Sequence, residues 1–260
     1  MKKICNRFTA FRIKFFLSIV LLAVSATTQA DLVQTIKKIK PSIVGIGTYS
    51  ATRTPPAKLT GTGFVVSNGR YAVTNYHVIE PLTSLKYNEK LVVFVGQGEN
   101  AKYREAKIRA SDKEHDLALV EFTGHPLPSL KLESPTLVEE GQSCAFTGFP
   151  IGAVLGLYPV THRAIISSVT PIASQPSNSR QLTAKLISKL RDTYYVYQLD
   201  ATAYPGNSGS PLYDKKGKVI GVINMVFVKE SKETILQKPS GITYAIPVKY
   251  IHQMLDDLNL

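Results

Sequence analysis

The strongest indication of the fold is a hexapeptide that reads Gly206-Asn207-Ser208-Gly209-Ser210-Pro211. Two polar residues precede it. His77 lies in a Thr-Asn-Tyr-His-Val segment, and Asp116 directly precedes the apolar run 117–122. A serine hydroxyl becomes a good nucleophile only when a neighbouring base accepts its proton, and that base needs a third group to fix its tautomer. We therefore predict that Ser208 is a nucleophile, His77 its general base and Asp116 the group that orients the histidine.

The glycines beside Ser208 indicate a tight turn. Glycine tolerates the backbone angles of such a turn, which aims amide N–H groups at the oxyanion that forms during acyl transfer. We expect the amides of Gly206 and Ser208 to be the oxyanion donors. The alternative is a coincidence of a core histidine, a strand-capping aspartate and a Gly-Ser turn. The apolar, strand-like segments beside the histidine and the aspartate argue against it.

The order His, Asp, Ser along the chain is that of the chymotrypsin-like serine proteases, and it differs from the orders in subtilisins and α/β-hydrolases. From about Val33 to the C-terminus the sequence resembles the protease domain of the HtrA (Deg) family. The segments that carry this resemblance are Gly61–Phe64, Thr74–Val78, Asp116–Leu119, Thr147–Gly152, Asp200–Gly209 and Gly241–Pro247. The resemblance implies an all-β, trypsin-like fold of two packed antiparallel β-barrels, with the three residues in the cleft between them.

The resemblance also implies a substrate pocket. Its expected walls are two uncharged triplets, Thr202, Ala203 and Tyr204 on one side and Val222, Ile223 and Asn224 on the other. Such a pocket favours a small or medium apolar residue on the acyl side of the cleaved bond. No cofactor is expected, and the spacing of the other histidines does not indicate a metal site. His115 is expected to face away from His77, because neighbouring strand residues point to opposite faces.

Two features depart from the family pattern. HtrA proteins usually carry one or two PDZ domains after the protease, whereas this chain ends 13 residues after Pro247 (260 minus 247), so no PDZ domain is expected. The nucleophile motif continues as Gly209-Ser210, where the family more often has two glycines. The glutamyl endopeptidases share this version, but they place a histidine that binds an acidic side chain where this chain has Ile223.

The N-terminus has the composition of a secretory signal peptide. Five basic residues precede an apolar run at 15–24, and small polar residues lead to Ala30, where we expect cleavage. An uncleaved membrane anchor is the weaker alternative, because a spanning helix needs roughly 20 apolar residues. We expect a periplasmic or secreted protein with no membrane span after cleavage. Its single cysteine, Cys144, lies in an apolar segment and is expected to be buried and structural.

The mature chain of 230 residues (260 minus 30) is long enough for one two-barrel domain. We place the N-terminal barrel at about 31–130 and the C-terminal barrel at about 136–247, followed by a helix at 248–258. A proline-rich linker between the barrels is expected within 125–141, and a short helix within 31–40.

The positive charge is partly a property of the signal segment. The first thirty residues hold five of the 31 Lys and Arg and no acidic residue, so the mature chain carries 26 minus 19, or +7. These charges are scattered without interleaved aromatics, and nucleic-acid binding is therefore not expected. The segment 179–192 has leucines at helical spacing among basic residues. It predicts an amphipathic helix that either packs on the C-terminal barrel or forms a docking surface beside the active site.

These observations together predict an exported serine endopeptidase that cleaves proteins or peptides through an acyl-enzyme. The alternative is a protease-like module that binds unfolded polypeptide by strand addition without efficient turnover. No feature of the sequence indicates an oligomeric state.

Overall fold

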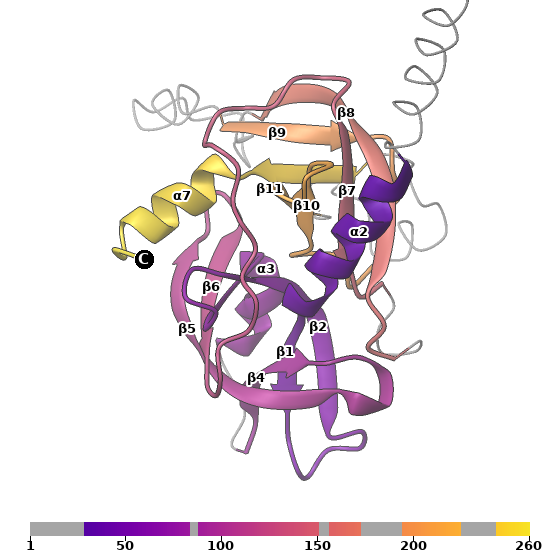
Figure 1. Ribbon diagram of the computed structural model, residues 1–260. Coiled ribbons are helices and arrows are strands. Elements are labelled where there is room, and N and C mark those ends of the chain that lie inside the picture. Colours follow the sequence, from indigo (N-terminus) through magenta and orange to yellow (C-terminus); the bar gives the residue numbers. More distant parts are fainter. Residues whose placement is uncertain (1–28, 84–87, 151–155, 173–193, 225–242) are drawn as a thin grey trace, which may run out of the picture.

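The chain forms two closed, six-stranded antiparallel barrels, seen one above the other in Figure 1. This computed structural model describes residues 29–83, 88–150, 156–172, 194–224 and 243–260. The all-β, trypsin-like fold predicted from the sequence is confirmed, with short helices near both ends of the described chain. Most of the predicted signal peptide and the predicted helix at 179–192 lie outside the described residues.

The first barrel closes in the strand order β1-β2-β3-β6-β5-β4. Its strands are β1 (Ile43–Tyr49), β2 (Ala57–Val66), β3 (Tyr71–Thr74), β4 (Lys90–Val95), β5 (Lys102–Asp112) and β6 (Leu117–Phe122). The second barrel repeats the same pattern as β10-β11-β12-β9-β8-β7. Its strands are β7 (Ser143–Gly148), β8 (Val160–Ile172), β9 (Tyr194–Leu199), β10 (Pro211–Tyr213), β11 (Val219–Asn224) and β12 (Thr243–Pro247).

The burial of strand β6 on both of its faces explains why its sequence is mostly apolar. Leu117 and Leu119 point into a core shared by the two barrels, whereas Ala118 and Val120 point into the first barrel's own interior. Successive strand residues face opposite sides, and here both sides are buried. The buried strand predicted directly after Asp116 is therefore confirmed.

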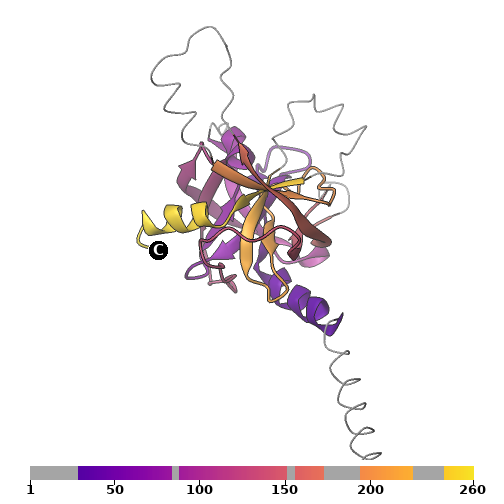
Figure 2. The same ribbon diagram turned by 90° about the horizontal axis from the view of Figure 1, so that it is seen from above.

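The core between the barrels joins the whole chain into one unit. It contains Phe64 from the first barrel and Val222 from the second, together with side chains from both terminal helices, Ile39 of α2 (Gln29–Ile39) and Ile251 of α7 (Lys249–Asp256). Complete burial of one such side chain contributes about 1.5–3 kcal/mol. The two helices lie on different sides of the barrels (Figure 2). None of the described helices is long and apolar enough to cross a membrane.

The connection between the barrels is hydrogen-bonded to both of them. Leu130 N–H donates to the carbonyl of Val65 in the first barrel, and Glu133 N–H donates to Val219 in the second, both at 2.8 Å. Further along, Val138 N–H donates to the Tyr197 hydroxyl at 3.1 Å. These contacts fix the orientation of one barrel against the other, and with it the geometry of the cleft between them.

Cys144 lies inside the second barrel, as predicted. It is 6% exposed, and its thiol donates to the carbonyl of Ala164 at 3.4 Å. Burial raises the pKa of the Cys144 thiol to about 12. The reactive thiolate is therefore scarce at neutral pH.

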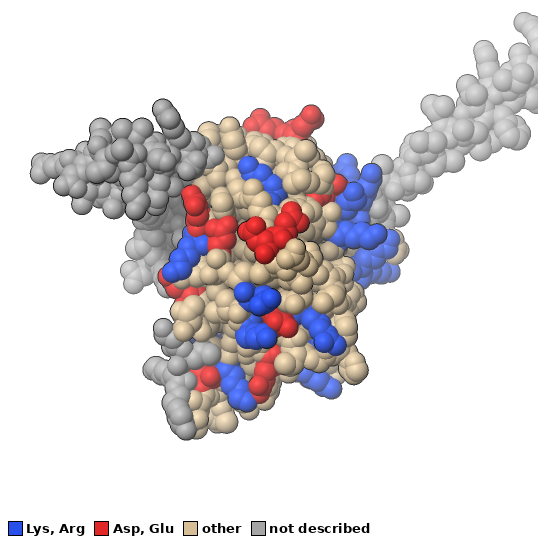
Figure 3. Space-filling model, turned by 90° about the vertical axis from the view of Figure 1, so that its left-hand side faces the viewer, with Lys and Arg blue, Asp and Glu red and all other residues tan. Residues whose placement is uncertain are grey.

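Charged side chains of both signs are interspersed on the face that carries α7 (Figure 3). Surface ion pairs of the described chain include Lys107 with Glu121 at 3.2 Å and Lys218 with Glu133 at 3.1 Å. Exposed pairs of this kind contribute about 1 kcal/mol at most. The fold is thus held by its apolar cores rather than by its surface charges.

Candidate active site

His77 is presented by a very short helix at the end of β3. The helix α3 (Tyr76–Ile79) buries Val78 and Ile79 in the first barrel, which leaves the His77 side chain 26% exposed toward the cleft. Asn75, in extended conformation, starts the helix. The burial of the two apolar residues that follow it is what leaves His77 on the outer side of this helix.

Asp116 holds both the backbone and the ring of His77. Its Oδ1 accepts the backbone N–H of His77 at 2.8 Å, and its Oδ2 lies 2.7 Å from His77 Nδ1. Its backbone carbonyl also accepts the N–H of Tyr76 at 3.1 Å. A carboxylate can only accept hydrogen bonds, so the proton of the neutral imidazole resides on Nδ1. The other ring nitrogen, Nε2, is therefore left as an acceptor.

Two asparagines complete the hydrogen bonding of Asp116. Asn224 Nδ2 donates to Asp116 Oδ2 at 2.9 Å, and Asn75 Nδ2 donates to the backbone carbonyl of Asp116 at 3.0 Å. Both asparagines are almost fully buried. Asn224 was predicted to line the substrate pocket, whereas its side chain contacts Asp116. No role was predicted for Asn75.

Ser208 lies in a turn between β9 and β10 that is fastened to the other barrel. Its carbonyl accepts the N–H of Thr62 at 2.9 Å, and the Thr62 hydroxyl donates to the carbonyl of Gly206 at 2.6 Å. Gly209 has φ +86°, and a Cβ there would lie 2.0 Å from the carbonyl oxygen of Thr62. The glycine is therefore required for the turn to approach β2 this closely.

The helix that carries His77 and the turn that carries Ser208 both contact β2 at Gly61. A Cβ at Gly61 would lie 2.7 Å from the side chain of Val78, which follows His77, and 3.1 Å from the carbonyl oxygen of Ser208. Within the described part of the chain, no hydrogen bond joins Ser208 Oγ to His77 Nε2. Bonds of this kind are often long in an empty site and shorten when substrate binds.

Two backbone amides of the Ser208 turn donate no hydrogen bond to another described residue. The N–H groups of Asn207 and Ser210 donate within the turn, to the carbonyls of Tyr204 and Asn207. The N–H groups of Gly206 and Ser208 donate to no acceptor among the described residues. These are the two amides predicted to be the oxyanion donors, and N–H groups without an acceptor among the described residues can bind an anionic oxygen.

Comparison with known families agrees with this geometry. A family model described as a trypsin-like peptidase domain matches residues 61–222, a segment that contains His77, Asp116 and Ser208. The chain belongs to the trypsin-like peptidase family. Within that family the resemblance to HtrA and DegP proteins inferred from the sequence is confirmed by individual relatives.

The "Probable periplasmic serine endoprotease DegP-like" of Hahella chejuensis is 23% identical over 98% of this chain and 54% of its own length. "Protease Do-like 5, chloroplastic" of Arabidopsis thaliana is 28% identical over 83% of this chain and 65% of its own. The solved structure of an HtrA-type protease with a tripeptide matches at a TM-score of 0.59 and 23% identity, over 86% of this chain and 62% of that one. This trypsin-like peptidase thus spans about half to two thirds of these relatives and matches their protease domain region.

The residues predicted to line the substrate pocket lie in two segments of this trypsin-like peptidase. Thr202 and Ala203 are half-buried and Tyr204 is 38% exposed, in the loop that leads to the Ser208 turn. Val222 and Ile223 are fully buried in β11, the first in the core between the barrels and the second inside the C-terminal barrel. Their side chains belong to these cores, so any pocket wall at β11 consists of its backbone.

Two other histidines have defined surroundings: His115 directly precedes Asp116, and His162 lies on β8 of the second barrel. The expectation for His115 rested on a wrong premise, because it lies in the turn at 113–116 and not in a strand. His162 stacks on Phe146 with ring centroids 4.8 Å apart, and its ring lies 6.4 Å from that of Tyr204. Burial lowers the pKa of His162, which keeps this ring neutral at neutral pH. In the described ranges, no three His, Cys, Asp or Glu side chains gather as a metal site.

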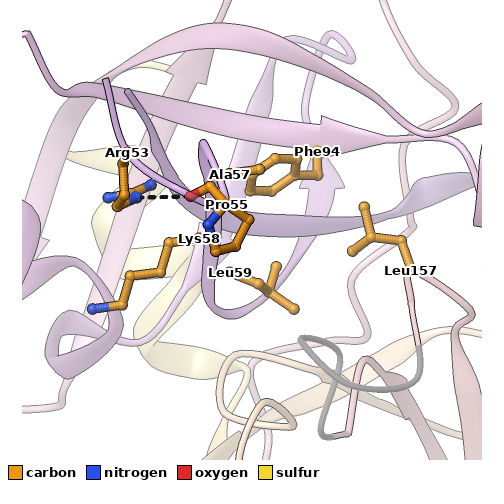
Figure 4. A pocket seen from close by; sticks show the side chains of 7 residues that line it. All are labelled: Arg53, Pro55, Ala57, Lys58, Leu59, Phe94 and Leu157. Atoms are coloured by element: carbon orange, nitrogen blue, oxygen red, sulfur yellow. Dashed lines mark hydrogen bonds between the residues drawn. The ribbon is translucent and has the colours of Figure 1, made fainter. Parts of the chain in front are cut away.

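A mainly apolar hollow of about 340 Å³ opens where β2 begins (Figure 4). Leu59, Phe94 and Leu157 line it, and Arg53 and Lys58 are its two cations. The guanidinium group of Arg53 is already engaged in hydrogen bonds. It binds Glu89 at 2.7 Å and the carbonyls of Thr48, Pro55 and Pro56. The same strand continues from Leu59 to Thr62, which holds the Ser208 turn.

Proposed function

We propose that this protein is a serine endopeptidase that cleaves proteins or peptides through an acyl-enzyme. The observation that carries the proposal is the Asp116 carboxylate, which binds both the backbone and the ring of His77. This pair lies beside the Ser208 turn with its two free amides. Membership of the trypsin-like peptidase family supports the same reaction.

The reaction follows from the hydrogen-bonding capacities of these groups. His77 Nε2 takes the proton of Ser208 as Oγ bonds to the carbonyl carbon of the substrate, and Asp116 stabilises the imidazolium. The carbonyl oxygen becomes an anion, to which the amides of Gly206 and Ser208 each contribute roughly 3 kcal/mol of stabilisation. His77 then gives its proton to the leaving amine as the C–N bond breaks. Water hydrolyses the resulting ester with His77 again as base.

Covalent labelling tests the proposed nucleophile directly. A fluorophosphonate probe is expected to attach to wild-type protein, and digestion followed by mass spectrometry should place the label on Ser208. Labelling of another residue, or no labelling of folded protein, would overturn the assignment. Hydrolysis of casein by the same preparation tests the class of substrate.

A second candidate is a module that binds unfolded polypeptide without efficient turnover. Two observations favour it: among the described residues no hydrogen bond joins Ser208 Oγ to His77, and the hollow at the start of β2 offers an apolar surface on the strand that also binds the Ser208 turn. This candidate predicts that wild-type protein retards aggregation of an unfolded client yet cleaves neither casein nor peptides. Steady hydrolysis by wild-type protein excludes it.

The proposed enzyme is expected to prefer small or medium apolar residues on the acyl side of the cleaved bond. Around the predicted pocket His162 is neutral, and the nearby acid Asp200 is occupied because its Oδ1 accepts the N–H of Ile165 at 2.7 Å. A charged substrate side chain would lose its hydration with no partner to replace it. We expect apolar residues to be favoured by more than about tenfold in kcat/KM.

Mass-spectrometric profiling of cleavage sites in a denatured protein library measures this preference directly. The pocket has been assigned wrongly if most cuts follow Lys, Arg, Asp or Glu. A Ser208→Ala sample processed in parallel removes the background of contaminating proteases.

The enzyme is also expected to need no activating cleavage beyond removal of the signal segment. In trypsin-like zymogens, the residue before the nucleophile is an aspartate that pairs with a newly freed ammonium group. Here it is Asn207, fully buried and uncharged, with neither amide atom bonded to another group. A new N-terminal ammonium group would find no counter-charge there.

Intact-mass analysis and N-terminal sequencing of active protein test this prediction together with the proposed export. We expect activity from protein that begins at Asp31, after the segment predicted to direct secretion. Protein of that length that stays inert until an internal peptide bond is cut would contradict it. One of the relatives named above is described as periplasmic and one as chloroplastic, which supports a destination outside the cytoplasm.

A further inference from the structure

The aspartate of the triad lies in an unusual backbone conformation. Asp116 ends the turn that connects β5 to β6, and its φ is +52°, in the left-handed region. Residues other than glycine adopt this region only where the surrounding structure holds them there. The groups that hold this turn therefore also determine where the Asp116 carboxylate lies.

His115, the preceding residue, is fixed along one edge of its ring by Asp112. Asp112 Oδ1 accepts the N–H groups of Glu114 at 3.0 Å and His115 at 3.1 Å, and its Oδ2 lies 2.6 Å from His115 Nδ1. Burial alone would raise the pKa of Asp112, but the hydrogen bonds from His115 and Glu114 outweigh it and lower that pKa. Asp112 is thus ionised at neutral pH and acts as an acceptor for the turn.

The face of the His115 ring is fixed by the C-terminal helix. The ring stacks on Tyr250 of α7 with centroids 3.8 Å apart and planes inclined by 22°, and it meets Tyr194 edge-on at 5.2 Å. Tyr250 is 4% exposed and Tyr194 is 8% exposed. In Figure 1, α7 lies next to the ends of β5 and β6. The three rings therefore join α7 to the residue adjacent to Asp116.

We propose that His115 is a positioning residue, through which Tyr250 of α7 holds Asp116 in line with His77. The proposal rests on the proposed function of the triad. Asp116 accepts hydrogen bonds through both carboxylate oxygens and its carbonyl, so a small rotation of the turn weakens several of them together. A misplacement of about 1 Å in a catalytic group can lower turnover roughly a hundredfold.

The test compares two replacements of Tyr250 in the full chain. Tyr250→Phe keeps the stacked ring and is expected to keep wild-type kcat. Tyr250→Leu keeps an apolar side chain but removes the ring, and His115→Ala removes the other member of the stack. We expect the latter two to lower kcat between about tenfold and a hundredfold while KM stays unchanged.

The matched control lies on the same helix. His252 Nε2 donates to the carbonyl of Glu133, in the connection between the barrels, at 2.7 Å. His252→Ala is expected to lower the unfolding temperature while kcat stays at the wild-type value. If His115 served only to stabilise the fold, kcat would fall in every variant whose unfolding temperature falls, His252→Ala included.

A spectroscopic measurement separates this proposal from the proposed function. The proton on His77 Nδ1, hydrogen-bonded to Asp116, is expected to give a far-downfield NMR resonance in wild-type protein and in Tyr250→Phe. It should broaden or move in Tyr250→Leu. Wild-type protein without peptidase activity but with this pattern would overturn the proposed function and keep the positioning role. Equal resonances and equal kcat in the two Tyr250 variants would overturn the positioning role.

Discussion

Replacing Ser208 with alanine is expected to lower kcat for peptide hydrolysis by roughly 10⁶-fold, because the substitution removes the atom that forms the acyl-enzyme. The fold should not change. The turn is held by the backbone carbonyls of Ser208 and Gly206, which bind Thr62, and no described residue is hydrogen-bonded to the Ser208 hydroxyl. His77→Ala removes the base of the same unit and is expected to cost nearly as much.

The matched control for this prediction is Ser210→Ala, two residues further along the same turn. Ser210 is fully buried, and its hydroxyl has no hydrogen-bond partner. Its loss should therefore leave both activity and the free energy of unfolding nearly unchanged. Casein hydrolysis and thermal unfolding of the wild-type protein, Ser208→Ala and Ser210→Ala measure the difference between the two serines. Retention of more than a few per cent of wild-type activity by Ser208→Ala would show that another residue is the nucleophile.

The three residues of the proposed triad could be singled out from the sequence because each sits in a short segment whose local structure is fixed by its own sequence. Glycines define the Ser208 turn, buried apolar residues orient α3 around His77, and an apolar strand follows Asp116. The pairing of residues 39 positions apart, His77 and Asp116, has no local signature. It was inferred from the order His, Asp, Ser along the chain and not from periodicity.

The role of Asn224 could not be read from the sequence, because it depends on strand register. In β11, Asn224 pairs with Tyr244 of β12, and this register turns its amide toward Asp116. A slip of one residue would direct it to the opposite face. The same reasoning explains Val222 and Ile223, whose neighbouring side chains point into two different cores.

The premise about His115 was wrong because the strand pattern was extended across a turn. Asp112 ends β5, and its side chain accepts the N–H groups of Glu114 and His115, two and three residues later, which is the hydrogen bonding of an Asx-type turn. The run Asp-Lys-Glu-His, polar throughout between two strands, was the available signal. The stack on Tyr250, 135 residues later (250 minus 115), had no signal in the sequence.

Replacing Asp116 with asparagine is expected to leave a folded protein whose kcat is lower by roughly 10⁴-fold, because the substitution imposes the wrong tautomer on His77. The new amide has one oxygen and one NH₂ group to place at the two carboxylate positions. At the Oδ1 position the NH₂ group would face the backbone N–H of His77, 2.8 Å away, and two donors would oppose each other. That backbone group cannot turn.

The NH₂ group therefore takes the Oδ2 position, where it donates to His77 Nδ1 and drives the ring proton to Nε2. Asn224, which donates to Oδ2 in the wild-type protein, can rotate its amide and present its oxygen instead. The hydrogen bonds between residue 116 and both His77 and Asn224 are then kept, so the unfolding temperature should change by less than about 4 °C. His77 Nε2, however, now carries a proton and cannot accept that of Ser208.

Turnover, fluorophosphonate labelling and thermal unfolding of Asp116→Asn test this argument, with Asp214→Asn as the matched control. Asp214 also caps a turn, since its Oδ1 accepts the N–H groups of Lys216 and Lys218, but it lies at the β10–β11 connection and contacts no triad residue. An asparagine there can make the same bonds, and wild-type kcat is expected. If Asp116→Asn kept a tenth or more of wild-type kcat, the tautomer of His77 would not depend on Asp116, and the aspartate would have to be assigned a purely structural role.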